Sequence, residues 1–263
     1  MLDYRTHWGL LDRPFNLTGG RHMFLSSAHR RLIADLSSLM ASSPVLIWLE
    51  ASRNSGLTTL LSYLAQMNGL GHHAVHAIAS RESQEFTRET IGSLLGAVEI
   101  CQESGQKDLL NLAVSAIESD FRKGISTIWM LDRPGSSLLN FTMDLAAECD
   151  GLSLILADTA ESLDLLDHSV SQQKMDQHNL CFGRLSRPET QHFLKSQILE
   201  VGGAAGIFSE FASRLIHEKT LGKIGLIQKL ADQSMQLAAA LKRRHVTADV
   251  VAYVVEKSHV RAA

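Results

Sequence analysis

The chain has 263 residues, of which 45% are hydrophobic and 20% charged, the composition of an ordinary water-soluble protein with a sizeable core. Its formal net charge is −3, so no overall positive field indicates nucleic-acid binding. No window approaches the roughly 18 apolar residues of a membrane span, and the N-terminus lacks the apolar stretch of a signal peptide. The three cysteines are far apart and outside any CxxC pattern. We therefore expect a soluble cytoplasmic protein with reduced thiols.

The first half of the chain predicts a leader followed by helices and strands. Residues 1–26 read as an irregular leader, whose aromatic side chains indicate that it packs on the folded domain. The expected elements that follow are a helix at 27–40, a strand at 45–50, a helix at 58–67, a strand at 72–78, and helices at 87–97 and 107–121. The strand at 72–78 contains His72, His73 and His76, but strand alternation places His73 on the opposite face. Since no cysteine or carboxylate joins them, we interpret them as solvated histidines and predict no metal site.

The middle of the chain contains two continuous apolar runs, at 126–132 and 151–157. Such runs are typical of strands that are buried on both faces of a parallel sheet. The first run closes in Asp132, and the second is followed by Asp158 and Thr159. We expect helices at 138–149 and 160–167, then a polar stretch from 168 to 179 and a short strand at 180–183.

In the last part of the chain, the residue pattern predicts only helices. Ser186 and Glu189 form a capping box that opens the first of them. The expected helices are 187–201, 208–220, 223–242 and 247–258. The order of elements predicts an α/β fold, a parallel β-sheet sandwich with a C-terminal helical lid. We place the core at 45–185 and the lid at 186–263, with the leader and first helix, 1–44, packed on the core.

The turn after the first strand has the arrangement of a phosphate-binding loop, because a small polar segment joins a strand to the start of a helix. The motif for such loops is G-x-x-x-x-G-K-[ST], and the window Ala51–Thr58 reads ASRNSGLT. Gly56 and Thr58 match the motif, whereas Ala51 replaces the first glycine and Leu57 replaces the lysine. That lysine contacts the β- and γ-phosphates, and losing one charge-assisted contact costs about 1.5–3 kcal/mol. Taken alone, the stretch also fits a βα turn that binds nothing.

The strand exits strengthen the phosphate-loop interpretation. Ligands of open parallel sheets bind outside the carboxyl ends of the strands. The loop at 51–56, Asp132 and Thr159 all follow such ends. The predicted remnant nucleotide site consists of Asn54, Ser55, Gly56, Thr58, Thr59, Asp132 and Thr159. If a Mg-nucleotide binds, Thr58 and Asp132 are the expected metal ligands.

Short sequence blocks extend this interpretation over nearly the whole chain. They are Tyr4-x-x-x-Trp8-Gly9-Leu10-x-x-x-Pro14-Phe15, Phe24-Leu25-Ser26-x-Ala28-His29, Leu60-Leu61, Leu131-Asp132, Leu154–Glu161, Leu185-Ser186-x-x-Glu189-Thr190, Gly202 with Phe208, and Leu221-Gly222 through Ile227. In these blocks and their order the chain resembles the AAA+ ATPases of the general secretion pathway protein A (ExeA) type, which are close to the transposition-helper ATPases. The resemblance implies an AAA+ core with a helical lid, and ATP bound between them and often between subunits.

The same resemblance implies that the charged groups of the family's site are replaced. Leu57 is at the position of the loop lysine, and Arg133 is at the position of the glutamate that acts on the attacking water. Gly225 is at the position of the lid arginine. Where related chains place a trans-acting arginine, between about 168 and 180, only Lys174 is cationic. Phosphoryl transfer depends on positioning and charge stabilisation, so these losses predict a pseudo-ATPase without catalytic residues.

We therefore expect a degenerate AAA+ protein that acts as a binding, regulatory or scaffold subunit, without a bound cofactor. Its expected partners are proteins, with related active AAA+ subunits or further copies of the chain as candidates. The alternative is a functional AAA+ ATPase of secretion or DNA-transposition type, which binds ATP or ADP with Mg²⁺ and uses Arg53 or Lys223 for the missing cations. A third hypothesis, DNA binding, depends on Lys242–His245, but cations at a helix C-terminus also favour the helix dipole. Because the chain ends at Ala263 without the family's membrane span, an envelope role would need a partner.

Overall fold

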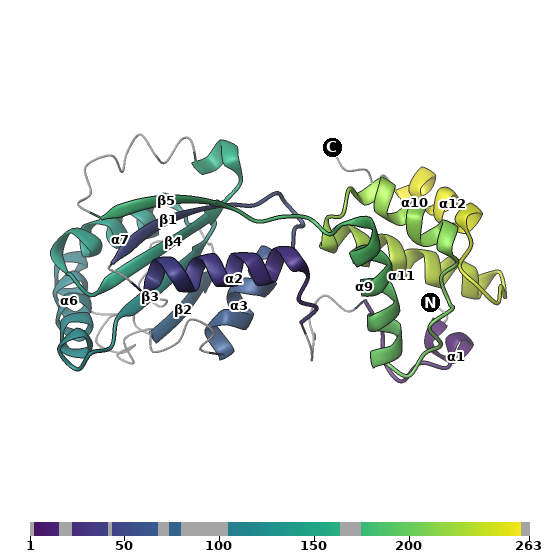
Figure 1. Cartoon of the computed structure of the whole chain (residues 1–263), viewed down its shortest axis with the longest axis horizontal. Helices are drawn as coiled ribbons and strands as arrows, with labels where there is room; N and C mark the ends of the chain where they lie inside the picture. Colours follow the sequence, from purple (N-terminus) through teal and green to yellow (C-terminus); the bar gives the residue numbers. More distant parts are fainter. Residues whose placement is uncertain are drawn as a thin grey trace. The chain divides into compact units, whose positions relative to one another are not determined.

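The computed structural model describes residues 3–15, 23–41, 44–67, 74–79, 105–163 and 175–258. The chain forms two compact units (Figure 1). The sheet unit comprises His29–Ser52 and Leu57–Phe182, and the helical unit comprises Met1–Ala28, Arg53–Gly56 and Gly183–Ala263. We expected the whole leader to pack on the α/β core, but its residues up to Ala28 belong to the helical unit. Part of the phosphate-loop segment groups with the helices as well.

The sheet unit is built on five strands in the order β2-β3-β4-β1-β5, and all neighbours are parallel. The strands are β1 (Val45–Glu50), β2 (Ala74–Ala79), β3 (Thr127–Asp132), β4 (Leu152–Asp158) and β5 (Asp176–Cys181). β3 is buried along its whole length, and β1 and β4 are buried except at their last residue. The prediction of a parallel α/β fold with buried central strands is confirmed.

Helices cover the sheet. The sheet unit contains α2 (Ser27–Met40, which begins in the helical unit), α3 (Leu57–Met67), α6 (Gln106–Arg122) and α7 (Ser136–Glu148). Apolar side chains of α6 and α7 form one cluster with Leu46, Trp129 and Leu154. Strand alternation points Ile47 and Leu49 to the opposite face, where they are buried as well. Both faces of β1 are therefore covered.

The helical unit packs around its own core. Its helices are α1 (Tyr4–Trp8), α9 (Arg187–Glu200), α10 (Glu210–Thr220), α11 (Ile224–Ala240) and α12 (Ala248–Ser258). The predicted capping box at the start of α9 is present, with Ser186 and Glu189 bonded reciprocally. The leader is anchored on α11, because the Tyr4 hydroxyl donates to Asp232 and the Trp8 indole N–H donates to the Met235 carbonyl at 3.2 Å. The leader is thus partly helical, not irregular throughout.

The last strand is where the prediction from sequence is wrong. We expected a polar stretch up to residue 179 and a strand at 180–183, but β5 spans Asp176–Cys181. β5 lies at the edge of the sheet and pairs with β1. All its residues are exposed or half-buried. An edge strand reaches water and needs no apolar run, so the sequence pattern that marks β3 and β4 is missing.

Other differences from the expected elements are small. α3 begins one residue earlier than expected, α7 begins two residues earlier, and β2 begins at Ala74. The expected helix at 87–97, the histidines His72 and His73, the part of the expected 160–167 helix after 163, and Lys174 lie outside the described residues. Across the ranges that the structure describes, no helix is long and apolar enough to cross a membrane. In the same ranges, no group of three or more His, Cys, Asp or Glu side chains is placed to hold a metal ion.

Candidate functional site

The carboxyl ends of β1, β3 and β4 meet at one edge of the sheet. In the register, Glu50 is opposite Asp158 and Asp132 is opposite Ala157. The chain leaving β1 is held by the Ala51 N–H, which donates to the Asp158 carbonyl at 2.8 Å. The chain leaving β3 is held in the same way, because the Arg133 N–H donates to the Ala157 carbonyl at 2.7 Å. The chain segments that follow β1 and β3 are therefore both hydrogen-bonded to β4, which lies between these two strands in the sheet.

The phosphate-loop segment has the backbone of a tight βα turn. Asn54 and Gly56 have φ values of 63° and 91°, in the left-handed region. At Gly56 this conformation favours glycine, which has no Cβ to clash with the backbone. Helix α3 begins at the next residue, Leu57. The turn therefore keeps the strand–loop–helix geometry of an anion-binding loop.

The start of α11 lies against this loop within the helical unit. The Gly225 N–H donates to the Asn54 carbonyl at 2.9 Å. A Cβ at Gly225 would lie 3.2 Å from that same carbonyl oxygen, and a Cβ at Gly56 would lie 2.5 Å from Cγ2 of Ile224. Glycine at position 225, where the resemblance implies an arginine, thus allows this close approach of two backbones. The groups of α11 that face the loop are the Gly225 peptide and the Ile224 side chain, which bring no positive charge.

Leu57 is part of the protein interior. Its relative exposure is 7%, while the next two residues, Thr58 and Thr59, are exposed. A buried isobutyl group offers no charge to a phosphate. The position that holds the motif's lysine is therefore used for packing.

Thr58, Asp132 and Arg133 form a closed set of polar contacts within the sheet unit. The Thr58 hydroxyl donates to Oδ2 of Asp132. The Arg133 guanidinium donates from Nε to Oδ1 of Asp132 at 3.2 Å and from Nη2 to Oγ1 of Thr58 at 3.4 Å. The Asp132 side chain is 9% exposed and that of Arg133 is 52% exposed. The guanidinium therefore spans the two oxygens that were predicted as metal ligands.

Thr159 has other contacts. Its N–H donates to Oδ1 of Asp158 at 2.7 Å, and its hydroxyl lies 3.0 Å from the Ser162 hydroxyl. Residues 160–163 are helical. Of the predicted site residues, Thr58 and Asp132 touch each other, whereas Asn54 bonds to Gly225 and Thr159 caps the turn into the following helix. The sequence did not indicate the contact of Arg133 with Thr58, because the two residues are 75 positions apart.

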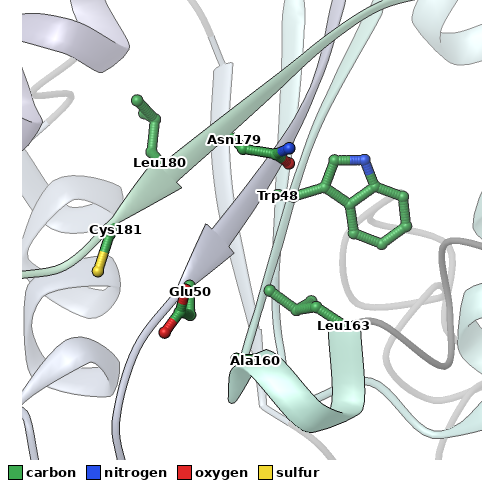
Figure 2. A pocket seen from close by; sticks show the side chains of 7 residues that line it. All are labelled: Trp48, Glu50, Ala160, Leu163, Asn179, Leu180 and Cys181. Atoms are coloured by element: carbon green, nitrogen blue, oxygen red, sulfur yellow. The ribbon is translucent and has the colours of Figure 1, made fainter.

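A pocket of about 270 Å³ lies elsewhere on the sheet unit. Figure 2 shows its lining, which comes from β1, β5 and the segment after β4: Trp48, Glu50, Ala160, Leu163, Asn179, Leu180 and Cys181. The Trp48 indole N–H donates to the Gln177 side chain at 3.2 Å. None of the predicted site residues lines this pocket, so it is not part of the candidate site.

Comparison with known proteins identifies the fold. No family model matches the sequence, and no curated protein matches it. Among solved structures, the ORC2 protein of Aeropyrum pernix, solved as ADPNP-ADP complexes, is 12% identical with a TM-score of 0.62, covering 93% of this chain and 71% of that one. CDC6P of Pyrobaculum aerophilum is 16% identical with a TM-score of 0.65, covering 90% and 68%. The RuvB Holliday junction branch migration motor of Thermotoga maritima is 12% identical with a TM-score of 0.53, covering 89% and 70%.

These similarities cover 89–93% of this chain. The chain therefore has the α/β P-loop NTPase fold of the AAA+ type, as the sequence predicted. At 11–16% identity the likeness concerns the fold. What the protein does has to be argued from its own side chains.

Proposed function

We propose that the protein is a catalytically inactive AAA+ module of the ExeA-like type, a pseudo-ATPase that acts as a binding, regulatory or scaffold subunit. The position and contacts of Arg133 are the observation that carries this proposal. Its guanidinium bonds to Asp132 and Thr58, at the strand exit where the resemblance implies a glutamate. A guanidinium stays protonated in proteins and accepts no hydrogen bond, so it takes no proton from an attacking water.

The phosphate loop supports the same proposal. Leu57 is buried, and Gly225 has no side chain that could reach a phosphate. In P-loop enzymes a lysine and arginines neutralise the charge that spreads over the transferred phosphoryl group. Each such contact is worth orders of magnitude in rate, because the reaction consists almost entirely of positioning and charge stabilisation. A chain that lacks them at both places is better suited to binding than to hydrolysis.

The proposed partners are proteins, with related active AAA+ subunits and further copies of this chain as the first candidates. Nucleic acid is not favoured, since the net charge is −3 and the basic cluster after α11 has structural contacts. The Arg243 guanidinium lies 3.8 Å from the Asp249 carboxylate, and the Arg243 carbonyl is 2.8 Å from the His7 ring. His245 contacts the Gly206 carbonyl at 3.0 Å. A cytoplasmic location belongs to this proposal, because the widely spaced cysteines suit a reducing compartment.

An ATPase assay on the purified full chain tests the proposal. We expect no hydrolysis above the background of the T58A and D132N variants, with Mg²⁺ present. Hydrolysis by the wild type that is lost in both variants would overturn it. In that case R53A and K223A, alone and together, decide whether displaced cations perform the chemistry, which is the alternative of a working ATPase. Light scattering of the same sample determines whether the chain self-associates.

A further inference from the structure

The guanidinium of Arg133 contacts the two side chains that correspond to the metal ligands of a P-loop protein. In that fold a Ser or Thr hydroxyl and a strand-end aspartate hold Mg²⁺. Thr58 and Asp132 are these two residues, and they contact each other directly. Arg133 donates one N–H to each of them, at 3.4 and 3.2 Å. One cation of the chain itself is thus bonded to both side chains of the pair.

Mg²⁺ does not fit this arrangement. It requires near-ideal octahedral coordination, with oxygens at about 2.0–2.1 Å. Here the Thr58 hydroxyl directs its proton to Asp132, and its oxygen accepts from Arg133. Oδ1 of Asp132 is also bonded to the guanidinium. A divalent ion would have to displace a positive charge that is already paired with the single carboxylate of the set.

The backbone keeps Arg133 in this place. Neighbouring residues of a strand point to opposite faces, so a residue next to Asp132 would normally face away from it. Arg133 instead has a φ of 51°, in the left-handed region, and its N–H is bonded to the Ala157 carbonyl. The chain turns directly after β3, and the guanidinium lies beside the carboxylate of the preceding residue.

We propose that Arg133 replaces the magnesium ion as an internal cation and closes the Thr58–Asp132 pair to divalent metals. This inference deepens the proposed function and rests on it, since a hydrolysing site of this fold needs the same two oxygens for its metal. The proposed function says that the site lacks catalytic groups. The inference adds that a positive charge of the chain itself excludes the metal ion from the site. A nucleotide at the loop would accordingly bind without a metal.

Binding of Mn²⁺ alone tests the inference, by the loss of the free-ion signal in electron paramagnetic resonance. The sample is the chelator-treated full chain without nucleotide. We expect the wild type to bind no more Mn²⁺ than the D132N variant, which provides the surface background. In R133E the cation is replaced by a third oxygen ligand. We expect one Mn²⁺ per chain, bound about 10–100-fold more tightly than by the wild type, and lost again in R133E/D132N.

A second variant covers the case in which R133E does not fold. R133Q keeps a polar side chain of similar length without the charge, and we expect a smaller gain that also depends on Asp132. Circular dichroism checks the fold of each variant. Asp132-dependent Mn²⁺ binding by the wild type would overturn the inference, whatever the variants do. A folded R133E or R133Q with no gain would overturn it as well, because the guanidinium would then not be what excludes the metal.

The outcomes separate this inference from the proposed function. Mn²⁺ binding by a wild type that hydrolyses no ATP would remove the inference and leave the pseudo-ATPase proposal in place. Hydrolysis that persists in excess chelator, with no Mn²⁺ bound, would remove the pseudo-ATPase proposal while supporting an internal cation.

Discussion

The phosphate loop and the exit of β3 depart from the resembled family in opposite directions. At the loop a lysine position is occupied by Leu57, so a positive charge is missing. At the exit of β3 a glutamate position is occupied by Arg133, so a negative charge is missing and a positive one is added beside Asp132. Under the proposed function, the loop lacks the cation that a phosphate needs, and the strand exit carries a cation that a metal would have to displace.

The backbone at the two places is held by its own conformation and by hydrogen bonds. Gly56 has a left-handed conformation before α3, and the chain after β3 is bonded to β4 through the Arg133 N–H. Under the proposed function, the two places act together against a Mg-nucleotide, because such a ligand depends on charges at both. The proposal thus separates the frame of a nucleotide site, which is kept as structure, from its charges, which are exchanged. Two sets of variants test how far each place depends on backbone or on side chain, and a third set tests a carboxylate of the helical unit.

The largest effect is expected at the loop backbone, from Gly56→Ala. An alanine there would adopt a φ of 91° and place its Cβ 2.5 Å from the Ile224 side chain. The left-handed conformation costs about 1–2 kcal/mol and overpacking about 1–3 kcal/mol. We expect the free energy of unfolding to fall by about 2–5 kcal/mol, the sum of the two costs, as measured by urea denaturation.

Two further variants separate the parts of this effect. In G56A/I224A the Ile224 side chain is shortened, so we expect the destabilisation due to overpacking to disappear. The destabilisation due to the left-handed conformation should remain. Gly206→Ala is the matched control, because no atom lies within 4 Å of its Cβ position, and we expect a change within about 0.5 kcal/mol. Wild-type stability in G56A would show that the loop does not depend on its left-handed turn.

The second effect is expected at the exit of β3, from Asp132→Ala. This variant removes the acceptor of both Thr58 and Arg133, and hydrogen bonds to charged groups contribute about 1.5–3 kcal/mol. We expect the free energy of unfolding to fall by about 2 kcal/mol. The measurement is urea denaturation monitored by the fluorescence of Trp48 and Trp129 in the sheet unit. R133A should cost about 0.5–1 kcal/mol, because its side chain is half exposed.

Asp158→Ala is the control for this prediction. Asp158 also ends a strand at the same edge, but its carboxylate accepts from the neighbouring Thr159 N–H and, among the residues that the structure describes, from no guanidinium. We expect D158A to lower the free energy of unfolding by less than D132A does. Equal losses in D132A and D158A would mean that the contacts with Thr58 and Arg133 contribute nothing specific, and would break the contrast between the two places.

The sequence predicted the central strands and the helical part well, for physical reasons. β3 and β4 are buried on both faces and are therefore continuous apolar runs, and the Ser186–Glu189 pattern marks a helix start by local contacts alone. β5 was placed too late because an edge strand carries no such run. At the site, the replacement of Glu by Arg133 is visible in the sequence, but its contacts with Thr58 and Asp132 are not. They depend on a turn geometry and on a pairing between distant segments, which residue patterns do not encode.

The smallest effect concerns a carboxylate without a guanidinium, Glu189, which sharpens the contrast with Asp132. Its oxygens accept from the Ser27 N–H at 2.7 Å and from the Ser186 N–H and hydroxyl at 2.9 and 2.7 Å. Burial acts to raise the pKa of Glu189, but these hydrogen bonds outweigh it and lower the pKa from 4.5 to about 2. Because the folded pKa is below the unfolded one, the stabilisation is present above pH 4.5 and is lost as the pH falls towards 2.

We therefore expect Glu189→Ala to lower the free energy of unfolding by about 1 kcal/mol at pH 7, less than the full shift implies because the side chain is partly exposed to solvent. The difference from the wild type should shrink between pH 4.5 and pH 2, in urea denaturation at each pH. Glu200→Ala, at the exposed end of the same helix, is the control and should show no such trend. A difference for E189A that stays constant down to pH 2 would mean that the capping box acts through packing, not through its charge.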